Sequence, residues 1–534
     1  MESTSSSIND EPIRVRDKVP LKLWLAMGAG MTERAAHYGS IVMIQNYVQN
    51  RYDDKSRPGV LGLGQEKATQ IQFAFSLINS LTPIVGALLA DSKWGRYWTI
   101  LYAFPIYLAG LAVLCAVSVN GAVAHKAGLG TLLVCLTLMA IGSGGIRVNM
   151  NAFIGDQYTM DSPGAFRDRR GRSVKPDHDL TLQHIYSSYY WMINIGSLAG
   201  IVTTLLEARV SFGVAFLVPL VFIALGLAIL VAFSKTFVRH GPTNGNLTRT
   251  VAYVRHHVRV RLGRSQARGN SQGPGYDEQF SQFMTDTWKA CRIFSTFTIA
   301  WLCWGQAENN FISQAGSMNT TGIPNDMLYF LNPIVLVIFI PCFEKGVYPF
   351  LRARGAKLTP VTRIFIGYII LTVSMIYIAG LQAIIYSRGP CYSHPRACPA
   401  SQNGALPNDI SAFAQIPVYV LQSIAEIFSQ IAATEYAYSK APDSMKSVMQ
   451  AIAQSFGSIA SLLGVAIAPA SRDPWLVIVY GSLAGAMAVT SVVFWYFFAR
   501  KGDAETSSGT VIDSTPIIAP DSEKEGGRVV TEGS

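Results

Sequence analysis

The sequence predicts an all-α membrane protein with about twelve transmembrane helices in two bundles of six. Half of the 534 residues are apolar and only 14% are charged, whereas a soluble chain carries about 25% charged residues. Apolar stretches recur from end to end at the length of about 20 residues that a helix needs to cross a bilayer. A long polar loop in the middle of the chain divides these stretches into two equal groups.

In each predicted span apolar residues dominate over the length of a membrane-crossing helix. The expected spans are residues 21–50, 66–92, 97–118, 129–153, 184–206, 212–234, 289–317, 327–350, 361–386, 412–438, 446–469 and 474–499. Residues 1–20 are polar and charged and contain no apolar core of a cleaved signal peptide, so insertion is expected to begin with the first span.

The domain organisation follows from the composition between the spans. We expect an N-terminal bundle over 21–234 and a C-terminal bundle over 289–499, joined by a basic linker over 235–288. The linker is rich in Gly, Asn, Ser and Arg, so it cannot bury a core and is predicted to be a cytoplasmic loop. Residues 500–534 are also polar and are predicted to be a disordered cytoplasmic tail.

The net charge of +10 comes from Lys and Arg residues that lie in alternate loops and not on one face. Five such residues lie between Arg167 and Lys175, and eight between Lys235 and Arg268. By the positive-inside rule these loops are cytoplasmic, which places both termini inside. The excess of Lys and Arg therefore indicates how the chain is oriented in a lipid bilayer, and it predicts no nucleic-acid partner.

Two ionisable residues, Glu33 and Arg34, lie near the middle of the first span. Both are costly in hydrocarbon, so they are expected to face a polar cavity or each other, as residues on a pathway for ions or substrate do. The alternative is a structural ion pair that locks two helices.

Two of the seven cysteines, Cys391 and Cys398, share one loop that the topology places outside the cytoplasm. A disulfide between them is expected in an oxidising exterior. A zinc site is the alternative, but His394 supplies only a third ligand and no fourth is nearby. We therefore expect no metal and no cofactor. Asn319 begins an N-T-T sequon near an outer loop and is a candidate for glycosylation.

The loop between the second and third spans reads G-A-L-L-A-D-S-K-W-G-R-Y-W-T-I. It resembles the cytoplasmic signature of the major facilitator superfamily, with Asp91, Gly95 and Arg96 at the signature positions. The resemblance implies two bundles that rock around a central site, with Asp91 and Arg96 in a gating ion network. The alternative is an ordinary charged turn.

A narrower resemblance covers nearly all of residues 20–500. Several segments resemble motifs of the proton-dependent oligopeptide transporter (POT/PTR) family, most of all its fungal branch, in the right order and on the expected helices. These segments are T-E-R-A-A-H-Y-G, G-S-G-G-I-R-V-N-M-N-A-F-I-G-D-Q-Y, Y-Y-W-M-I-N-I-G-S, N-N-F-I-S-Q-A-G-S-M-N followed by G-I-P-N-D, L-N-P-I-V-L-V-I-F-I-P, and A-E-I-F-S-Q-I-A-A-T-E-Y-A-Y-S-K-A-P-D-S-M-K-S-V.

A site for many peptides is expected to grip the two charged ends of the zwitterion and leave room for side chains. Arg34 and Arg147 are cations available for the carboxylate, and Glu426 is a carboxylate available for the ammonium group. Asn194 and Asn332 add neutral donors and acceptors. The family uses the matching positions in these roles, with a lysine more usual where Arg147 stands.

Aromatic residues near this site are weighed separately. Tyr38 matches a tyrosine that contacts peptide in the family and is expected to do so here. His37 has two alternative roles. It either functions directly, by binding an anion or by titrating near neutral pH, or it packs with hydrogen-bonded partners. Trp304 and Tyr436 could line pockets for substrate side chains, but packing is favoured for both because membrane helices carry many aromatics for that purpose.

The chain departs from the family pattern in its acidic residues. Gly30 occupies the position of the first glutamate in the first-helix motif, and Gly305 replaces an acidic residue on the seventh helix. Glu308, about one turn further on, is the nearest replacement and could approach Arg147. Glu33 is therefore the main candidate for proton coupling, with Glu308 as the second.

The resemblance implies a secondary transporter and not an enzyme, most simply a proton-coupled symporter of di- and tripeptides in a plasma membrane. One alternative is a relative that moves nitrate, a modified peptide or a secondary metabolite as a uniporter or exporter. Another is a transceptor that binds substrate but barely moves it. The intact gating signature favours a moving transporter over a transceptor.

Overall fold

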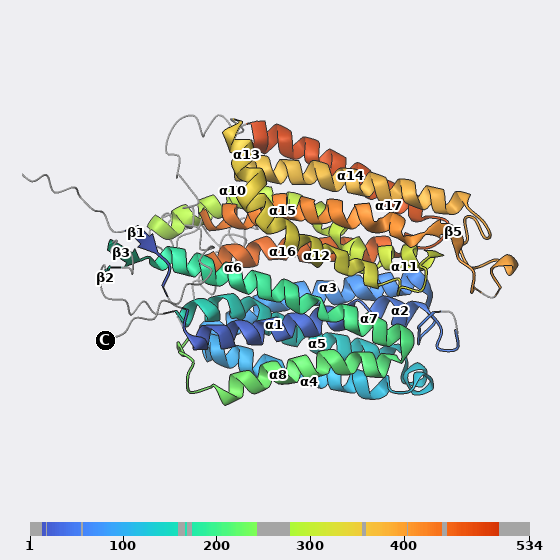
Figure 1. The fold of residues 1–534 in the computed structure, drawn as a ribbon, viewed down its shortest axis with the longest axis horizontal. Helices are drawn as coiled ribbons and strands as arrows, with labels where there is room; N and C mark the ends of the chain where they lie inside the picture. The colour runs from blue at the N-terminus through green and yellow to red at the C-terminus, as the bar shows by residue number, and fades with distance from the viewer. Residues whose placement is uncertain are drawn as a thin grey trace, which may run out of the picture.

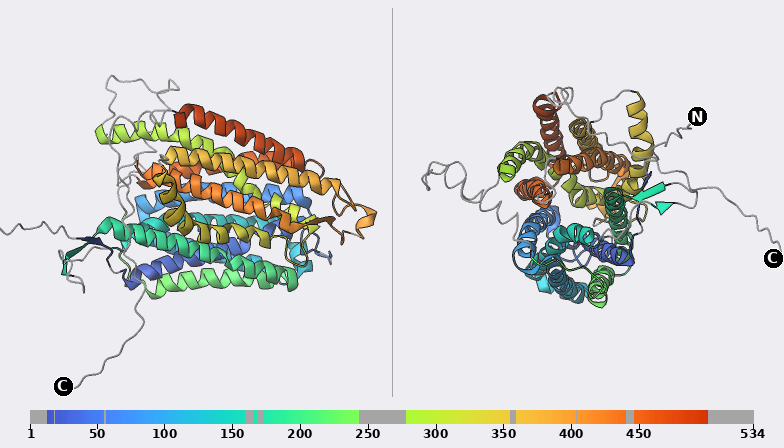
Figure 2. Two further views of the ribbon diagram at one scale, coloured as in Figure 1. Left: turned by 45° about the horizontal axis from the view of Figure 1, so that its top comes forward. Right: turned by 90° about the vertical axis from the view of Figure 1, so that its left-hand side faces the viewer.

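The computed structural model describes residues 13–17, 19–54, 57–158, 166–167, 173–242, 278–354, 359–402, 404–439 and 446–500. Long helices run side by side along one axis (Figure 1). In the view along that axis, helices coloured blue to green form one group and those coloured yellow to red form another (Figure 2). These two groups are called the N-half and the C-half below.

The N-half packs α4 on α5 and α8, α3 on α5, and α1 on α6 and α8. Its elements are α1 (Leu21–Ile41), α2 (Ile44–Gln49), α3 (Gly64–Leu89), the π-helical turn η1 (Ala90–Trp94), α4 (Arg96–Val117), α5 (Gly121–Asp156), α6 (His178–Ser197), α7 (Ala199–Arg209) and α8 (Phe212–Ala232). Buried aromatic side chains such as Phe104, Tyr107 and Phe216 fill its core. Helix α8 also exposes apolar side chains, as expected of a helix that faces lipid.

The C-half packs α14 on α15 and α17, and α10 on α16. Its helices are α10 (Glu278–Trp304), η2 (Gly305–Glu308), α11 (Asn310–Gly316), η3 (Met327–Phe330), α12 (Leu331–Cys342), η4 (Phe343–Val347), α13 (Tyr348–Ala353), α14 (Pro360–Ser387), η5 (Pro399–Ser401), η6 (Ala412–Gln415), α15 (Ile416–Ser439), α16 (Lys446–Ile467), η8 (Ala468–Ala470), α17 (Leu476–Phe494) and η9 (Trp495–Ala499). Thr359 caps α14 by accepting a hydrogen bond from the Thr362 amide, with Pro360 in the first turn. Across the boundary, α3 packs on α16 and α6 on α12.

Nine helices within the described residues are long and apolar enough to cross a membrane, and every predicted span contains helix. Three predicted spans, 21–50, 289–317 and 327–350, fall short of this standard of length and composition. The first carries Glu33 and Arg34, and the other two break into shorter helices. These three spans carry several of the candidate site residues. Such a combination is expected, because irregular backbone at membrane depth is tolerated where it lines a cavity.

Short strands that the sequence did not predict lie at both ends of the helices. At one end, β3 (Ser173–Pro176) pairs with β1 (Ile13–Val15) in parallel and with β2 (Phe166–Arg167) in antiparallel. At the other end, β4 (Met318–Asn319) pairs in parallel with β5 (Asn408–Ser411). We call the end with β1–β3 the inner end and the end with β4 and β5 the outer end, following the predicted topology. Part of the basic loop expected at 167–175 is therefore strand.

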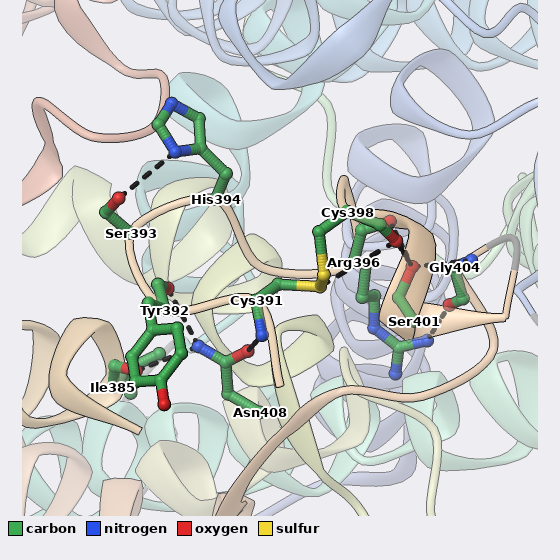
Figure 3. Close-up of a disulfide and its surroundings, with 10 residues drawn as sticks. All are labelled: Ile385, Cys391, Tyr392, Ser393, His394, Arg396, Cys398, Ser401, Gly404 and Asn408. Atoms are coloured by element: carbon green, nitrogen blue, oxygen red, sulfur yellow. Dashed lines mark hydrogen bonds between the residues drawn. A yellow bond between two sulfur atoms is a disulfide. The ribbon is translucent and has the colours of Figure 1, made fainter. Parts of the chain in front are cut away.

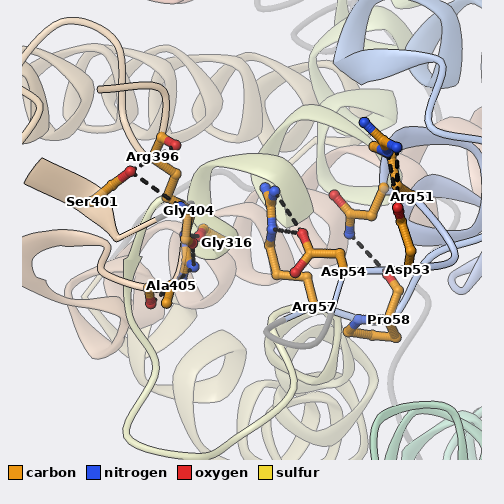
Figure 4. Close-up of polar contacts among 11 residues, drawn as sticks. Arg51, Asp53, Asp54, Arg57, Pro58, Gly316, Arg396, Ser401, Gly404 and Ala405 are labelled. Atoms are coloured by element: carbon orange, nitrogen blue, oxygen red, sulfur yellow. Dashed lines mark hydrogen bonds and ion pairs between the residues drawn. The ribbon is translucent and has the colours of Figure 1, made fainter. Parts of the chain in front are cut away.

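The outer end holds a disulfide between Cys391 and Cys398 (Figure 3). This bond occupies the two thiols that a zinc site would need. Arg396, between the two cysteines, donates hydrogen bonds to the carbonyl oxygens of Gly316 and Gly404, both at 2.6 Å (Figure 4). Burial, together with nearby Arg57, lowers the pKa of Arg396 to about 10, which leaves it charged at neutral pH. The disulfide loop is thus fastened to the end of α11.

Asn319 is exposed in β4 at this outer end. The predicted linker over 235–288 and the tail over 500–534 lie mostly outside the described residues, so the domain boundaries stay predictions.

Candidate substrate and proton site

Glu33 and Arg34 form an ion pair within α1. The Arg34 Nε and Nη2 donate to the two Glu33 carboxylate oxygens at 2.6 Å each. Ser143 of α5 donates to Glu33 at 2.8 Å and accepts from Arg34 at 3.2 Å. Both charged residues are buried, with 2% and 6% of their surface exposed. Because the two charges neutralise each other, Arg34 has to leave Glu33, at least in part, before it can hold a substrate carboxylate.

Arg147 of α5 differs from Arg34 in having no ion-pair partner among the described residues. Its side chain is exposed, although it interacts electrostatically with Arg34, Glu33, Tyr38 and Glu308 on neighbouring helices. The Arg147 side chain is thus accessible although these groups surround it. Arg147 is therefore the cation that is ready to bind an anion without prior rearrangement.

Glu308 lies in η2, where the helix that follows Trp304 tightens and then breaks. Tyr329 donates a hydrogen bond to the Glu308 carboxylate at 3.1 Å. Glu308 also interacts electrostatically with Arg147 and Arg34, but no direct hydrogen bond joins it to either residue. The break in the helix thus turns this carboxylate toward the cations of the N-half.

Glu426 of α15 and Asn332 of α12 lie together in the C-half. The Asn332 Nδ2 donates to Glu426 at 3.3 Å, and both residues are half-buried. Asn194 does not reach them, because its Nδ2 donates to the Tyr190 carbonyl of its own helix at 2.9 Å. The Tyr190 hydroxyl interacts with Glu426, so Tyr190 and not Asn194 connects α6 to this carboxylate. Sequence reasoning missed Tyr190, although it lies in the motif Y-Y-W-M-I-N-I-G-S.

Tyr38 lies where these groups meet. The Arg34 guanidinium carbon is 5.9 Å from the centre of the Tyr38 ring, and the Tyr329 ring centre is 6.4 Å away. Tyr38 also interacts electrostatically with Arg147, Glu308 and Glu426. The candidate site is therefore bipolar, with cations from the N-half and carboxylates from the C-half around one tyrosine.

The other aromatic candidates make ring contacts, and His37 is the one that touches the centre, with its ring centre 5.3 Å from that of Tyr38. His37 also stacks on Phe75 of α3 at 6.0 Å between ring centres, and its buried Nδ1 has no hydrogen-bond partner among the residues that the structure describes. Trp304 packs on Trp301 at 5.7 Å, and Tyr436 on Phe294 at 6.4 Å.

An ion pair at the inner end joins the start of α4 to the end of α5. Arg96 donates to both carboxylate oxygens of Asp156 at 2.6 and 2.8 Å, while Asp91 interacts with Arg96 electrostatically. Between them Gly95 has a φ of +77°, and a Cβ there would lie 2.5 Å from the His240 carbonyl oxygen. Only glycine fits this turn. Asp156 was missed as a partner, although it lies in the motif segment G-D-Q-Y.

At the outer end, side-chain hydrogen bonds join the two halves, and we call this set of contacts the outer seal. Gln45 donates to Ser313 at 2.9 Å, and Asn46 and Asn325 exchange hydrogen bonds at 3.0 Å. Thr69 donates to Asn310 at 2.9 Å. The outer end is closed by these contacts in this structure.

A hollow on the outer face, the outer cleft, lies beyond the seal. Its lining includes Asn46, Asn325, Arg57, Arg396 and Asp473. It is separate from the bipolar centre around Tyr38.

Comparison with known proteins places the chain. The POT family model PTR2 matches residues 97–481. The chain belongs to the POT family. Peptide transporter PTR_C of Candidozyma auris is 36% identical to this POT family member over 92% of this chain and 86% of the relative. Peptide transporter PTR2 of Saccharomyces cerevisiae is 32% identical over 95% of this chain and 84% of the relative.

Solved structures agree on the fold of this POT family chain. The crystal structure of the POT family transporter PepTSo matches with a TM-score of 0.71 and 19% identity, over 92% of this chain and 99% of that one. An auto-inhibited POT family peptide transporter matches with a TM-score of 0.68 and 19% identity, over 93% and 99%. The chain therefore has the major facilitator fold of POT transporters, as the sequence predicted.

Proposed function

We propose that this protein is a proton-coupled symporter that moves di- and tripeptides across the membrane by alternating access. The observation that carries the proposal is the meeting of opposite charges at Tyr38, which interacts with Arg34 and Arg147 on one side and with Glu308 and Glu426 on the other. A short peptide carries one carboxylate and one ammonium group, so its ends match this arrangement whatever its side chains are. The names of the relatives, which are peptide transporters, support the same substrate class.

Each substrate end has a proposed partner. Arg147, which has no ion-pair partner among the described residues, takes the carboxylate first, and Arg34 joins it by leaving Glu33. Glu426 takes the ammonium group, and Asn332, which already donates to Glu426, fixes the orientation of that carboxylate. Asn194 is proposed to act only indirectly, by holding the helix turn that carries Tyr190.

Proton coupling follows from the same exchange of partners. When a substrate carboxylate draws Arg34 away, the buried Glu33 carboxylate loses its counter-charge, and protonation of this carboxylate becomes more favourable. When Arg34 returns, the proton leaves. Glu308 is the second candidate, because it faces the same cations but keeps only the Tyr329 hydroxyl as a direct partner.

Asp91 and Arg96, with Asp156, are proposed to form the inner gate. The bilayer is proposed to be a plasma membrane. Both termini are proposed to lie in the cytoplasm, since the described basic residues Lys93, Arg96 and Lys175 lie at the inner end.

Substrate choice tests the proposal. The purified protein in proteoliposomes is expected to take up a labelled dipeptide faster than the free amino acid or nitrate. An excess of unlabelled dipeptide or tripeptide is expected to compete, and a dipeptide blocked at both ends is not. Uptake of nitrate without uptake of dipeptide would overturn the peptide assignment.

A further inference from the structure

Two buried carboxylates meet beside the outer seal, away from the bipolar centre. Glu207 lies near the end of α7 in the N-half, and Asp326 directly precedes η3 in the C-half. Glu207 has 4% of its surface exposed and Asp326 has none. Their side chains lie within hydrogen-bond contact of each other across the boundary between the halves.

No cation among the described residues forms an ion pair with either carboxylate. Asn46 donates to one Glu207 oxygen at 3.0 Å, while the other Glu207 oxygen and both Asp326 oxygens accept no side-chain hydrogen bond from a described residue. Two carboxylates are both acceptors, so they can hydrogen-bond to each other only if they share a proton, and two adjacent buried charges are otherwise strongly repulsive.

Among the described residues, the titratable groups on elements near the pair include Tyr329 of η3, whose hydroxyl donates to Glu308, and Tyr419 of α15. Tyr419 is fully buried and interacts electrostatically with Asp326, and its hydroxyl forms no hydrogen bond with a described residue. On α7 itself, Arg209 is exposed and lies two positions after Glu207, where side chains do not face each other. The described groups around the pair, which include the backbone N–H groups of Asp326 and Met327, are polar and uncharged, and they suit two carboxylates that share one proton and carry a single negative charge.

External water comes close to this pair. The outer cleft is lined by Asn46 and Asn325. Asn46 is also the direct hydrogen-bond donor to Glu207, and Asn325 binds Asn46. A single layer of amide side chains thus separates the two carboxylates from the outer face.

We propose that Glu207 and Asp326 form a proton-binding site that takes up one proton from the outer side when the outer seal closes. In the closed state the proton lies between one oxygen of each residue, and the pair carries a single negative charge. When the halves separate, each carboxylate is hydrated on its own and the proton returns to the outer solution. This proton does not cross the membrane, so the site is distinct from Glu33.

The sign of the pH effect follows by linkage. Closure takes up a proton, so a lower external pH stabilises the closed seal, and a higher external pH favours opening. With one linked proton, the ratio of closed to open changes by at most about tenfold for each pH unit. The inference rests on the proposed alternating access, because it requires that the outer end open and close.

The test measures opening of the seal directly. Ser313 is 7% exposed and accepts from Gln45 in the outer seal, so Ser313→Cys gives a thiol that a membrane-impermeant reagent reaches only when the seal opens. Full-length protein with this reporter is labelled in proteoliposomes at external pH 5.5 to 8. The Ser313→Cys reporter is also combined with Glu207→Gln and, separately, with Asp326→Asn. Each amide has nearly the shape of the carboxylate that it replaces and can donate a hydrogen bond without an extra proton.

At each pH the labelling rate of the protein with the reporter alone is divided by the labelling rate of each combined variant. The reporter thiol becomes more ionised at higher pH in all of these proteins, and the ratio cancels that effect. This ratio is expected to rise at least threefold from pH 5.5 to 8, and to do so with both variants. A ratio that stays constant over this range overturns the proposal. Exchange of labelled dipeptide verifies that each variant is folded.

Placing Glu33→Gln in the reporter protein separates this inference from the proposed function. The seal is expected to keep its pH response there even if proton-driven uptake is lost. Loss of the pH response in Glu33→Gln alone would assign the effect to the central site and overturn a separate outer site.

Discussion

Gly30 lies directly against Tyr189: a Cβ on Gly30 would stand 2.4 Å from the Tyr189 hydroxyl oxygen. The tyrosine on α6 thus fills the space where the family pattern has a glutamate on α1. Tyr189 is buried and interacts electrostatically with Arg34 and Glu33. The missing carboxylate is therefore replaced by a packed phenol beside the surviving ion pair.

We expect Gly30→Ala to destabilise the protein, because a rigid ring has to move to admit the new methyl group. The cost is expected to be about 1–3 kcal/mol, typical of overpacking. Gly28→Ala is the matched control on the same helix, since no atom lies within 4 Å of its Cβ position. Thermal unfolding in detergent measures both, and Tyr189→Leu should restore most of the loss caused by Gly30→Ala. Equal melting temperatures for the two alanine variants would contradict the close approach.

The two substrate ends can be tested separately. Arg147→Ala removes a cation proposed for a buried carboxylate, so peptide binding should weaken by about 1.5–3 kcal/mol, or about tenfold or more in Kd. Glu426→Gln should weaken peptides with a free amino end more than amino-blocked ones. Competition against a labelled dipeptide measures both effects, with Arg292→Ala, exposed on α10, as the control. If Glu426→Gln weakens free and blocked peptides equally, Glu426 does not bind the ammonium group.

Much of the fold and of the candidate site could be predicted from the sequence, because apolar stretches of spanning length and charges within them indicate which residues lie inside the membrane. The sequence alone identifies Glu33 and Arg34 as costly in a membrane span, and Cys391 and Cys398 as neighbours in one loop. What could not be predicted depends on contacts between distant segments. Tyr189 against Gly30 and Asp326 beside Glu207 each join helices far apart in the chain, and no local pattern encodes such pairs. The strand β1 also depends on pairing with residues more than 150 positions away.

The inner ion pair predicts a shared effect of two substitutions. Arg96→Gln and Asp156→Asn each break the same contact, so each should slow dipeptide uptake, and the double variant should be no slower than either alone. The interaction free energy of this double-mutant cycle is expected to be on the order of 1 kcal/mol. Lys93→Gln, exposed in the same turn, is the control and should leave the uptake rate unchanged. Strictly additive effects would show that the two residues act independently.

Topology gives a prediction that needs no transport assay. Asn319 is exposed in β4 at the outer end, so expression in a eukaryotic cell should attach a glycan that Asn319→Gln removes. A gel shift on glycosidase treatment measures this. Tags at Ser3, Gly273 and Ser534 should be reached by antibody only after the cells are permeabilised, and a tag at Asn403 should be reached in intact cells. Labelling of Ser3 and Ser534 from opposite sides would contradict the predicted orientation.

The central claim is that peptide movement is coupled to a proton through Glu33 and Arg34. The most direct measurement is accumulation of a labelled dipeptide in proteoliposomes above its external concentration when an inward proton gradient is imposed. The protein is expected to accumulate the dipeptide, and accumulation should vanish when a protonophore removes the gradient. Glu33→Gln should abolish accumulation while exchange of dipeptide across the membrane remains measurable. Equilibration of the dipeptide without accumulation by the unmodified protein would contradict proton coupling and show a uniporter.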